Sequence, residues 1–319
     1  MATWRRLQCN LIAQSAAMSY HPGMRKARPE GTDVPVRIPS RPSWIMAAPA
    51  ESLEDAAFRS GAALAHLHLV AADATVPQSL WRARLALSAA EICVRMVGRR
   101  EGAGELRDAL HLLRPGDRPG PAGEILRQWS RAVSRPISAA QLGKVLDGLS
   151  AERIAVYLEA AVDNPVDRAA AVLEAVLADA PRAETPALIL ADAALAKALG
   201  WDHLLPLLSL ALKPCDLRLQ GKDLRFACHR AVGSASGQVV TLAADLSRRA
   251  ARLRTVVPKL RAKGAARAVD LFLSQDALAP GALAVIMSDR AARRFCDRLV
   301  DLAAVRELTG RDTFRLYGV

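Results

Sequence analysis

The residues whose types and spacing could do chemistry are arginines near the end of the printed sequence. Six arginines of one predicted helix and the hairpin after it carry this signal: Arg290, Arg293, Arg294, Arg306, Arg311 and Arg315. A guanidinium is a planar cation that donates paired hydrogen bonds to a phosphate or to the edge of a guanine base. The sequence therefore predicts that these six side chains contact nucleic acid.

Three helices and a hairpin must position these arginines. Their predicted bounds are about 265–274, 280–286 and 288–303 for the helices, and 305–308 and 313–317 for the strands. Ser288 is a favourable N-cap for the third helix, and Asp289 beside it favours the positive end of the helix dipole. Three helices followed by a hairpin are typical of a winged helix-turn-helix, whose third helix enters the major groove of DNA.

The third predicted helix is amphipathic. At about 100° per residue, its apolar side chains fall on one arc that would pack on the first two helices: Ala291, Ala292, Phe295, Leu299 and Leu302. Arg290 and Arg293 fall on the opposite arc, with Arg294 beside them. Asp297 shares the polar arc and would repel a phosphate. Two alternatives remain open: the arginines only solvate an outer face, or the winged helix docks a partner protein.

The preceding part of the sequence predicts an all-α body. Residues 21–49 contain six prolines, which exclude a helix, so residues 1–50 are predicted to be a disordered basic extension, in which Met24 is an alternative start. From Ser52 onward, Ala and Leu recur at helical spacing. The predicted helices of this body, residues 51–213, are 52–72, 77–99, 103–113, 121–134, 138–148, 150–162, 165–179, 186–199 and 202–212.

A third region separates the body from the winged helix. The helical pattern weakens at 214–235, where Pro214, Gly221, Gly233 and Gly237 occur in or beside the stretch, and a basic helix is predicted from about 237 to 256. The division is therefore 1–50, 51–213, 214–264 as a basic connector, and 265–319. The fold class is mainly all-α: a multi-helix body followed by a C-terminal winged helix-turn-helix with a short β-hairpin.

The basic charge is concentrated towards the C-terminus. The 319 residues carry a net charge of +12. Residues 51–213 have 18 basic and 20 acidic groups, whereas residues 214–319 have 19 basic and 10 acidic groups, a net +9. Eight cations lie between Asp245 and Asp270 with no acidic residue among them: Arg248, Arg249, Arg252, Arg254, Lys259, Arg261, Lys263 and Arg267. This local excess favours a polyanionic partner, duplex DNA, for the C-terminal region.

Composition excludes several other classes of protein. Hydrophobic residues make up 51% and charged residues 24%, values that exclude a wholly disordered chain. The sequence contains no apolar run of membrane-spanning length, so we expect a soluble, cytoplasmic protein with no membrane partner. Five widely spaced cysteines without a C-x-x-C pair favour reduced, mostly buried thiols over disulfides or a zinc site.

The sequence predicts no enzyme, cofactor or metal site. His66 and His68 are two residues apart and would diverge on a helix, and the neighbours Cys228 and His229 would diverge in the same way. No nucleotide-binding or hydrolase motif occurs. The alternative of an enzyme with an unrecognised site in residues 51–213 stays open, because sites are assembled in three dimensions.

Several segments resemble one protein family. They are Trp81-Arg82, Arg114-Pro115-Gly116-Asp117, Leu199-Gly200-Trp201, Met287-Ser288-Asp289-Arg290, Leu308-Thr309-Gly310-Arg311 and Phe314-Arg315-Leu316-Tyr317. Over about residues 40–319 they resemble domain-of-unknown-function family 1403 of alpha-proteobacteria. The resemblance implies a bacterial, cytoplasmic, mainly helical protein and no known chemistry. The end of the sequence is also similar to the winged helix that closes many Fic-type proteins. Ala304 departs from the family pattern, in which Gly precedes Val305.

The sequence thus favours an uncharacterised bacterial protein that binds duplex DNA as a transcriptional regulator or accessory factor. A helical scaffold that uses its winged helix to bind a protein is the first alternative, and an enzyme is the second. Substitution of Arg290, Arg293 and Arg294 by alanine would weaken salt-dependent DNA binding under the first hypothesis. The sequence does not indicate the oligomeric state.

Overall fold

The structure, a computed structural model, describes residues 38–46, 50–114, 116–159 and 162–319. Most of the predicted extension at 1–50, with Cys9 and Met24, lies outside the described residues. Val36–Val319 forms one compact unit that is mainly helical, and the predicted boundaries at 213 and 264 fall inside it. None of the helices in the described ranges is long and apolar enough to cross a lipid bilayer.

The body is helical, as its apolar periodicity predicts. After a 3₁₀ turn, η1 (Ser43–Met46), its helices are α1 (Leu53–Ala71), α2 (Gln78–Met96), α3 (Ala103–His111), α4 (Gly120–Ser134), α5 (Ala139–Gly143), α6 (Ala151–Leu158), α7 (Pro165–Asp179), α8 (Glu184–Ala198) and α9 (Leu208–Ala211). Ser52, Ser138 and Ser150 each accept a hydrogen bond from a backbone N–H of the following first turn. These caps fix the starts of α1, α5 and α6.

The predicted helix at 202–212 is mostly wrong, since only Leu208–Ala211 is helical. The fully buried carboxylate of Asp192 explains where α9 begins. It accepts hydrogen bonds from the backbone N–H groups of Leu207 and Leu208, at 3.0 and 2.9 Å, and from the Ser209 hydroxyl at 3.0 Å. A carboxylate from another helix thus caps α9, and Pro206 disfavours helix before it.

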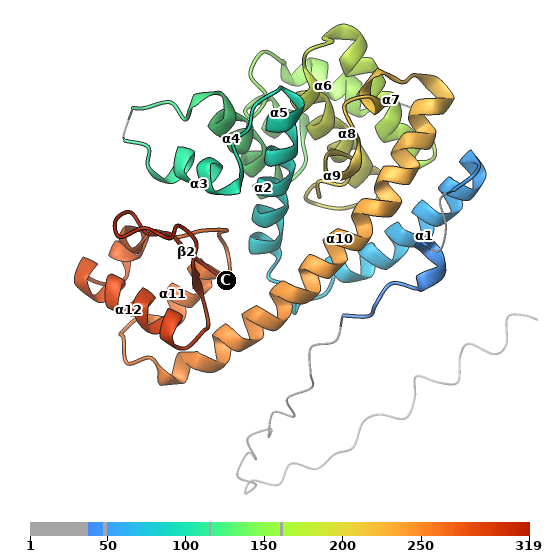
Figure 1. The fold of residues 1–319 in the computed structure, drawn as a ribbon. Helices are drawn as coiled ribbons and strands as arrows, with labels where there is room; N and C mark the ends of the chain where they lie inside the picture. The colour runs from blue at the N-terminus through green and yellow to red at the C-terminus, as the bar shows by residue number, and fades with distance from the viewer. Residues whose placement is uncertain (1–37, 47–49, 115, 160–161) are drawn as a thin grey trace, which may run out of the picture. The chain divides into compact units, whose positions relative to one another are not determined.

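The central element is α10 (Gly221–Val256), a helix of 36 residues that packs on α1, α2, α7 and α9 (Figure 1). The sequence predicts its start near 237, because Gly233 and Gly237 weaken the pattern. Instead both glycines lie inside the helix, and Gly237 lets a side chain approach it. A Cβ on Gly237 would lie 2.6 Å from the Arg41 guanidinium, which donates a 2.9 Å hydrogen bond to the Gly233 carbonyl. Gly237 therefore marks close packing and not a helix end.

Two fully buried tryptophans tie the helices of the body together. The Trp81 indole N–H donates to the Val239 carbonyl of α10 at 3.1 Å, and that of Trp129 lies 3.4 Å from the Cys93 sulfur. Each ring therefore contributes apolar burial and also satisfies its one polar atom. These contacts link α2 to α10 and α4 to α2. Cys93, Cys228 and Cys296 are buried free thiols, whereas Cys215 is exposed.

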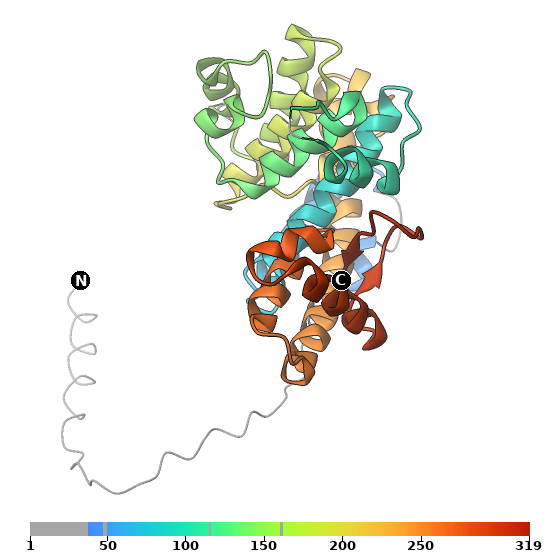
Figure 2. The same cartoon turned by 90° about the vertical axis from the view of Figure 1, so that its left-hand side faces the viewer.

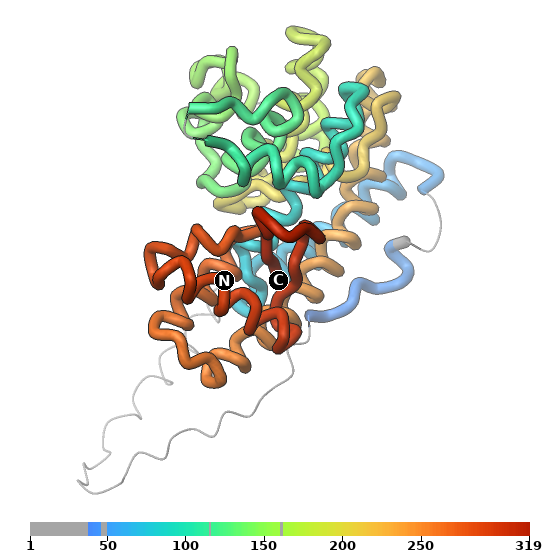
Figure 3. The backbone as a smooth tube through the Cα atoms, turned by 60° about the vertical axis from the view of Figure 1, so that its left-hand side comes forward, coloured from blue at the N-terminus to red at the C-terminus, as the bar shows by residue number. Residues whose placement is uncertain are grey.

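After α10 the chain turns back. The segment comprises η3 (Val257–Lys259), α11 (Ala265–Phe272), η4 (Pro280–Val285), α12 (Asp289–Asp301), β1 (Arg306–Glu307) and β2 (Tyr317–Gly318); η2 (Asp216–Arg218) precedes α10. Figures 2 and 3 show this segment beside the C-terminal half of α10. Helices and strands follow the predicted order, but the middle helix is a 3₁₀ turn.

The β-ladder is shorter than predicted. Arg306 pairs with Gly318 and Glu307 pairs with Tyr317, and Leu278 adds an isolated antiparallel bridge to Tyr317. The predicted second strand at 313–317 begins only at Tyr317, because Phe314 has a left-handed φ of +53° that interrupts an extended strand. Ser288 occupies the N-cap of α12, but its side chain makes no capping hydrogen bond.

Ion pairs fix the segment after α10 to the body. Asp276, in the loop after α11, lies between Arg84 of α2 and Arg107 of α3, with N–O distances of 2.5 and 2.6 Å. Arg311 donates to both carboxylate oxygens of Asp108 in α3, at 2.8 and 2.6 Å. Burial lowers the pKa of Arg84, which the Asp276 charge opposes. Since three largely buried charges meet here, each depends on its partner.

Candidate nucleic-acid interface

The exposed side of α12 carries a stripe of arginines. Ala292, Phe295 and Leu299 are buried, as the apolar arc predicts, and the opposite side faces solvent. Arg290, Arg294 and Arg298 recur at every fourth position and therefore lie along one line on this helix.

A turn brings a second set of cations to this stripe. α10 ends at Val256, and Gly264 adopts a left-handed φ of +85° immediately before α11. A Cβ on Gly264 would lie 2.5 Å from Cγ2 of Ile286, so the chain passes close to the segment before α12. Glycine both permits this backbone conformation and makes room for Ile286. The turn places Lys259 and Arg261 beside α12.

The two sets of cations line one groove of about 640 Å³. Its lining residues are Lys259, Leu260, Arg261, Ala262, Ala291, Arg294, Phe295 and Arg298. The four charged residues of this set are all basic, and all four are exposed. Within the described residues, none of the four forms an ion pair within 4.0 Å or a side-chain hydrogen bond. We call this feature the basic groove. It offers four uncompensated cations around an apolar floor.

The other predicted contact residues lie elsewhere. Arg293 pairs with Asp289 at 2.8 Å, and Arg311 is held by Asp108. Arg315 lies 3.9 Å from Glu307 and 3.7 Å from Asp312, and it donates to the Arg311 carbonyl at 3.0 Å. Arg306 is exposed on β1. Of the six predicted arginines, the structure therefore places only Arg294 in the basic groove, with Arg290 on the same stripe.

Two of the three acidic residues of α12, Asp289 and Asp297, lie on its hairpin side. A separate cavity there is lined by Asp289 and Asp297 together with Arg293, Arg315 and Tyr317. The Tyr317 hydroxyl donates to Asp297 at 3.4 Å. The sequence suggested that Asp297 would repel a phosphate bound to the arginines. Its place beside the hairpin removes that objection for the basic groove.

Lys259, Arg261 and Arg298 were not among the predicted contact residues. The sequence did contain a signal for each. Lys259 and Arg261 belong to the run of eight cations between Asp245 and Asp270, and Arg298 continues the four-residue spacing of Arg290 and Arg294. The sequence did not show that the turn at Gly264 brings Lys259 and Arg261 beside the arginines of α12.

A family model described as "Protein of unknown function (DUF1403)" matches residues 30–319. The chain belongs to this family. No curated protein matches the chain. The matched range contains the basic groove and every described helix, so membership of DUF1403 covers both the body and the segment after α10. It assigns no chemistry to either.

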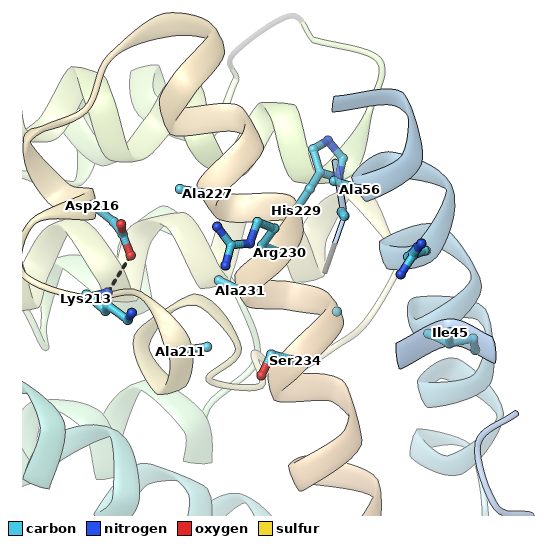
Figure 4. A pocket seen from close by; sticks show the side chains of 13 residues that line it. Ile45, Ala56, Ala211, Lys213, Asp216, Ala227, His229, Arg230, Ala231 and Ser234 are labelled. Atoms are coloured by element: carbon cyan, nitrogen blue, oxygen red, sulfur yellow. Dashed lines mark hydrogen bonds between the residues drawn. The ribbon is translucent and has the colours of Figure 1, made fainter. Parts of the chain in front are cut away.

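A second candidate site in this DUF1403 protein is a cavity of about 500 Å³ between α1 and α10 (Figure 4). His229 lines it, and behind this ring Ser60 Oγ lies 2.7 Å from Nδ1 and Asp167 Oδ1 lies 3.1 Å from Nε2. Burial lowers the pKa of His229, while Asp167 opposes this effect. Ser60 is only 1% exposed and its hydroxyl also lies 3.0 Å from the Ala57 carbonyl.

This Ser–His–Asp chain links helices rather than presenting a nucleophile. Ser60 belongs to α1, His229 to α10 and Asp167 to α7, so the imidazole joins three elements of the body. A serine nucleophile must reach its substrate, and Ser60 is enclosed. Lys213, Asp216 and Arg230 also line the cavity, and Asp216 accepts a hydrogen bond from the Lys213 N–H (Figure 4).

The remaining groups that could bind a metal are dispersed. Among the described residues, no group of three or more His, Cys, Asp or Glu side chains is arranged around a common point. His66 Nε2 lies 2.9 Å from the Pro39 carbonyl, whereas His68 Nδ1 accepts from Trp201. The two histidines thus diverge, as their spacing predicts.

Proposed function

We propose that this protein binds duplex DNA through the basic groove and the exposed stripe of α12. The observation that carries the proposal is the convergence of Lys259, Arg261, Arg294 and Arg298, without a compensating carboxylate, around one groove. Uncompensated surface cations bind phosphates by releasing condensed counterions, which supplies affinity without sequence preference. The partner is therefore a polyanion, and the protein is a bacterial, cytoplasmic DNA-binding factor.

The order of elements supports duplex DNA in particular. α11, η4 and α12 precede the ladder of β1 and β2, which is the order of a winged helix-turn-helix. In that arrangement α12 enters the major groove, where Arg290 and Arg294 meet base edges, and Lys259, Arg261 and Arg298 contact the phosphate backbone. Arg311 instead holds the hairpin to α3. This assigns the predicted arginines two different roles.

Salt-dependent binding of a labelled 30-base-pair duplex tests the proposal. The three phosphate contacts of Lys259, Arg261 and Arg298 predict a slope of about −2.7 for log K against log salt concentration. The combined variant Lys259→Gln, Arg261→Gln, Arg294→Gln and Arg298→Gln should lose on the order of 100-fold in affinity and most of this slope. Fluorescence anisotropy measures both quantities.

A matched control removes the same number of charges from the body. Arg95, Arg99, Arg127 and Arg153 are surface residues that each pair with a carboxylate, and their combined substitution by glutamine changes the net charge equally. It should change DNA affinity less than about threefold, because distant charges are screened. Equal losses in the two variants would reduce the effect to net charge and contradict the proposal.

Single substitutions on the two sides of α12 test which side contacts DNA. Arg294→Gln should weaken binding about five- to tenfold, because one phosphate or base contact is lost. Arg293→Gln, one residue away, should have little effect because Asp289 already neutralises this side chain. The same assay compares them, and a larger effect of Arg293 would place DNA on the hairpin side.

The alternative of a protein partner rests on the hairpin. Phe314 is 72% exposed and holds a left-handed φ of +53°. The exposed ring and the strained backbone both cost free energy, which contact of the ring with a partner protein would offset. A protein that binds here would leave the basic groove accessible. Loss of a stoichiometric partner on Phe314→Ser, with DNA affinity unchanged, would select this function.

A further inference from the structure

A third cavity, of about 270 Å³, lies where α1 ends, α2 begins and the segment after α8 returns. Its polar and aromatic lining residues are His68, Gln78, Trp81, Arg82, Trp201, Asp202 and His203. Trp81-Arg82 and Leu199-Gly200-Trp201, two of the segments by which the sequence resembles its family, thus meet here although more than 100 residues separate them. Trp81 belongs to the core, but neither the core nor the proposed DNA contact accounts for the polar groups around this cavity.

Arg82 is the unusual residue of this cavity. Its Nε is buried and has no hydrogen-bond partner, and burial lowers the pKa of the side chain. In the described ranges the guanidinium forms no ion pair within 4.0 Å, not even with Asp202, the carboxylate among the lining residues. Arg84, two residues along α2, is similarly enclosed but has Asp276. A largely buried cation without a counterion raises the free energy of the folded state, so an anion that binds here would be stabilised by Arg82.

The aromatic wall of the cavity is held in place. Gly200, with a left-handed φ of +70°, ends α8 and directs Trp201 towards α1. The Trp201 indole N–H then donates to His68 Nδ1 at 2.9 Å, and the two rings stack with their planes 24° apart. The two rings together form one aromatic wall of the cavity.

The histidines add hydrogen-bond donors. Because His68 Nδ1 accepts from Trp201, the proton of the neutral ring lies on Nε2, which has no partner among the described residues. Burial is the larger cause that lowers the pKa of His203, and the positive charge of the nearby Arg82 guanidinium lowers this pKa further. The Arg82 guanidinium and the imidazoles of His68 and His203 therefore line the same cavity.

We propose that this cavity binds a small planar carboxylate, with Arg82 as the residue that pairs with its two oxygens. The planar guanidinium matches a carboxylate in a two-pronged arrangement. The stacked His68 and Trp201 rings pack against the flat body of the ligand, and the volume suits a compact aromatic acid. The site is independent of DNA binding, and either can fail without the other.

Benzoate and benzamide, which have nearly the same shape, test this assignment in calorimetric titrations of the full chain. Benzoate should bind at least tenfold more tightly than the neutral amide, because only the anion compensates Arg82. Inorganic phosphate serves as a third probe. Binding of phosphate without benzoate would overturn the carboxylate class, and equal affinity for benzoate and benzamide would overturn the role of charge.

Arg82→Met tests the residue, with Arg95→Met on the exposed side of α2 as its control. Arg82→Met should abolish the benzoate-induced rise in melting temperature, whereas Arg95→Met should keep it. Without ligand, Arg82→Met should melt at or above the temperature of the parent protein, because a buried uncompensated charge is removed. A lower melting temperature would assign Arg82 a structural role and overturn the proposal.

Arg82→Lys provides a further test of the contact between Arg82 and the ligand. It keeps the charge but loses the planar pair of donors, so benzoate affinity should fall about tenfold while the preference for benzoate over benzamide remains. Unchanged benzoate affinity would contradict a paired contact with Arg82.

Discussion

The interior of this protein and its basic groove hold charged side chains in opposite ways. In the interior, Asp192 accepts hydrogen bonds from the start of α9, and Asp276 lies between Arg84 and Arg107. In the groove, Arg294 and Arg298 face no carboxylate among its lining residues. Interior carboxylates are therefore bound by partners within the protein, whereas groove charge remains available to a polyanion. The same residue type serves either purpose according to what lies within 4 Å.

The largest expected effect comes from breaking an interior pair. Asp276→Asn removes the carboxylate that pairs with both Arg84 and Arg107, whose side chains are less than a fifth exposed. The free energy of unfolding should fall by about 3 kcal/mol, because two buried cations are left uncompensated. Urea unfolding followed by tryptophan fluorescence measures this change.

Asp289→Asn is the matched control on the exposed side of α12. Its partner Arg293 is 70% exposed, so the loss should stay below about 1 kcal/mol. Similar losses in both variants would show that burial does not distinguish the two regions.

The second effect is a pH dependence that originates in Asp192. Burial raises the pKa of this carboxyl to about 6, against 3.8 for an exposed group, although its hydrogen bonds oppose the shift. Because the folded pKa is the higher one, the folded state binds the proton more tightly. The contribution of Asp192 to the free energy of unfolding is therefore greatest at low pH and decreases as the pH rises from about 4 to about 6.

Comparison with Asp192→Asn isolates this contribution from other carboxylates. Between pH 4 and pH 7 the parent protein should lose about 2 kcal/mol of unfolding free energy relative to the variant. Denaturant titrations across this range provide the two curves. Parallel curves would mean that Asp192 has the same pKa in the folded and unfolded chain.

The smallest effect concerns the turn that assembles the basic groove. Gly264→Ala should lower stability by about 1 to 2 kcal/mol, because φ is +85° and the added Cβ meets Ile286. Displacement of Lys259 and Arg261 should also weaken DNA binding several-fold. Unfolding and anisotropy titrations measure the two consequences.

Gly310→Ala is the matched variant, since φ is +60° there and no atom lies within 4 Å of the added Cβ. It should show the backbone cost without the loss of DNA affinity. If both variants weakened DNA binding equally, the position of the turn at Gly264 would not matter.

Local chemistry made much of the fold predictable. The apolar spacing of the body predicts its helices. In the structure Ser52, Ser138 and Ser150 cap three of them through backbone atoms only three residues away. The amphipathic face of α12 follows from its own period in the same way. Gly233 and Gly237 misled the prediction for α10, since glycine suggests a helix end in sequence. In three dimensions both lie inside the helix, and Gly237 permits the close packing of Arg41.

The sequence by itself determined the helical class, the order of elements after α10 and the excess of basic residues there. Tertiary structure alone decided which of those residues are neutralised. Arg311 meets Asp108 across 203 positions, whereas Arg294 meets Lys259 and Arg261 in a groove that contains no acid. Periodicity places side chains on a face of their own helix, but an ion pair depends on a distance of a few ångströms between elements. That distance is set by turns such as the one at Gly264, and it separates an arginine that stabilises the fold from one that is free to bind.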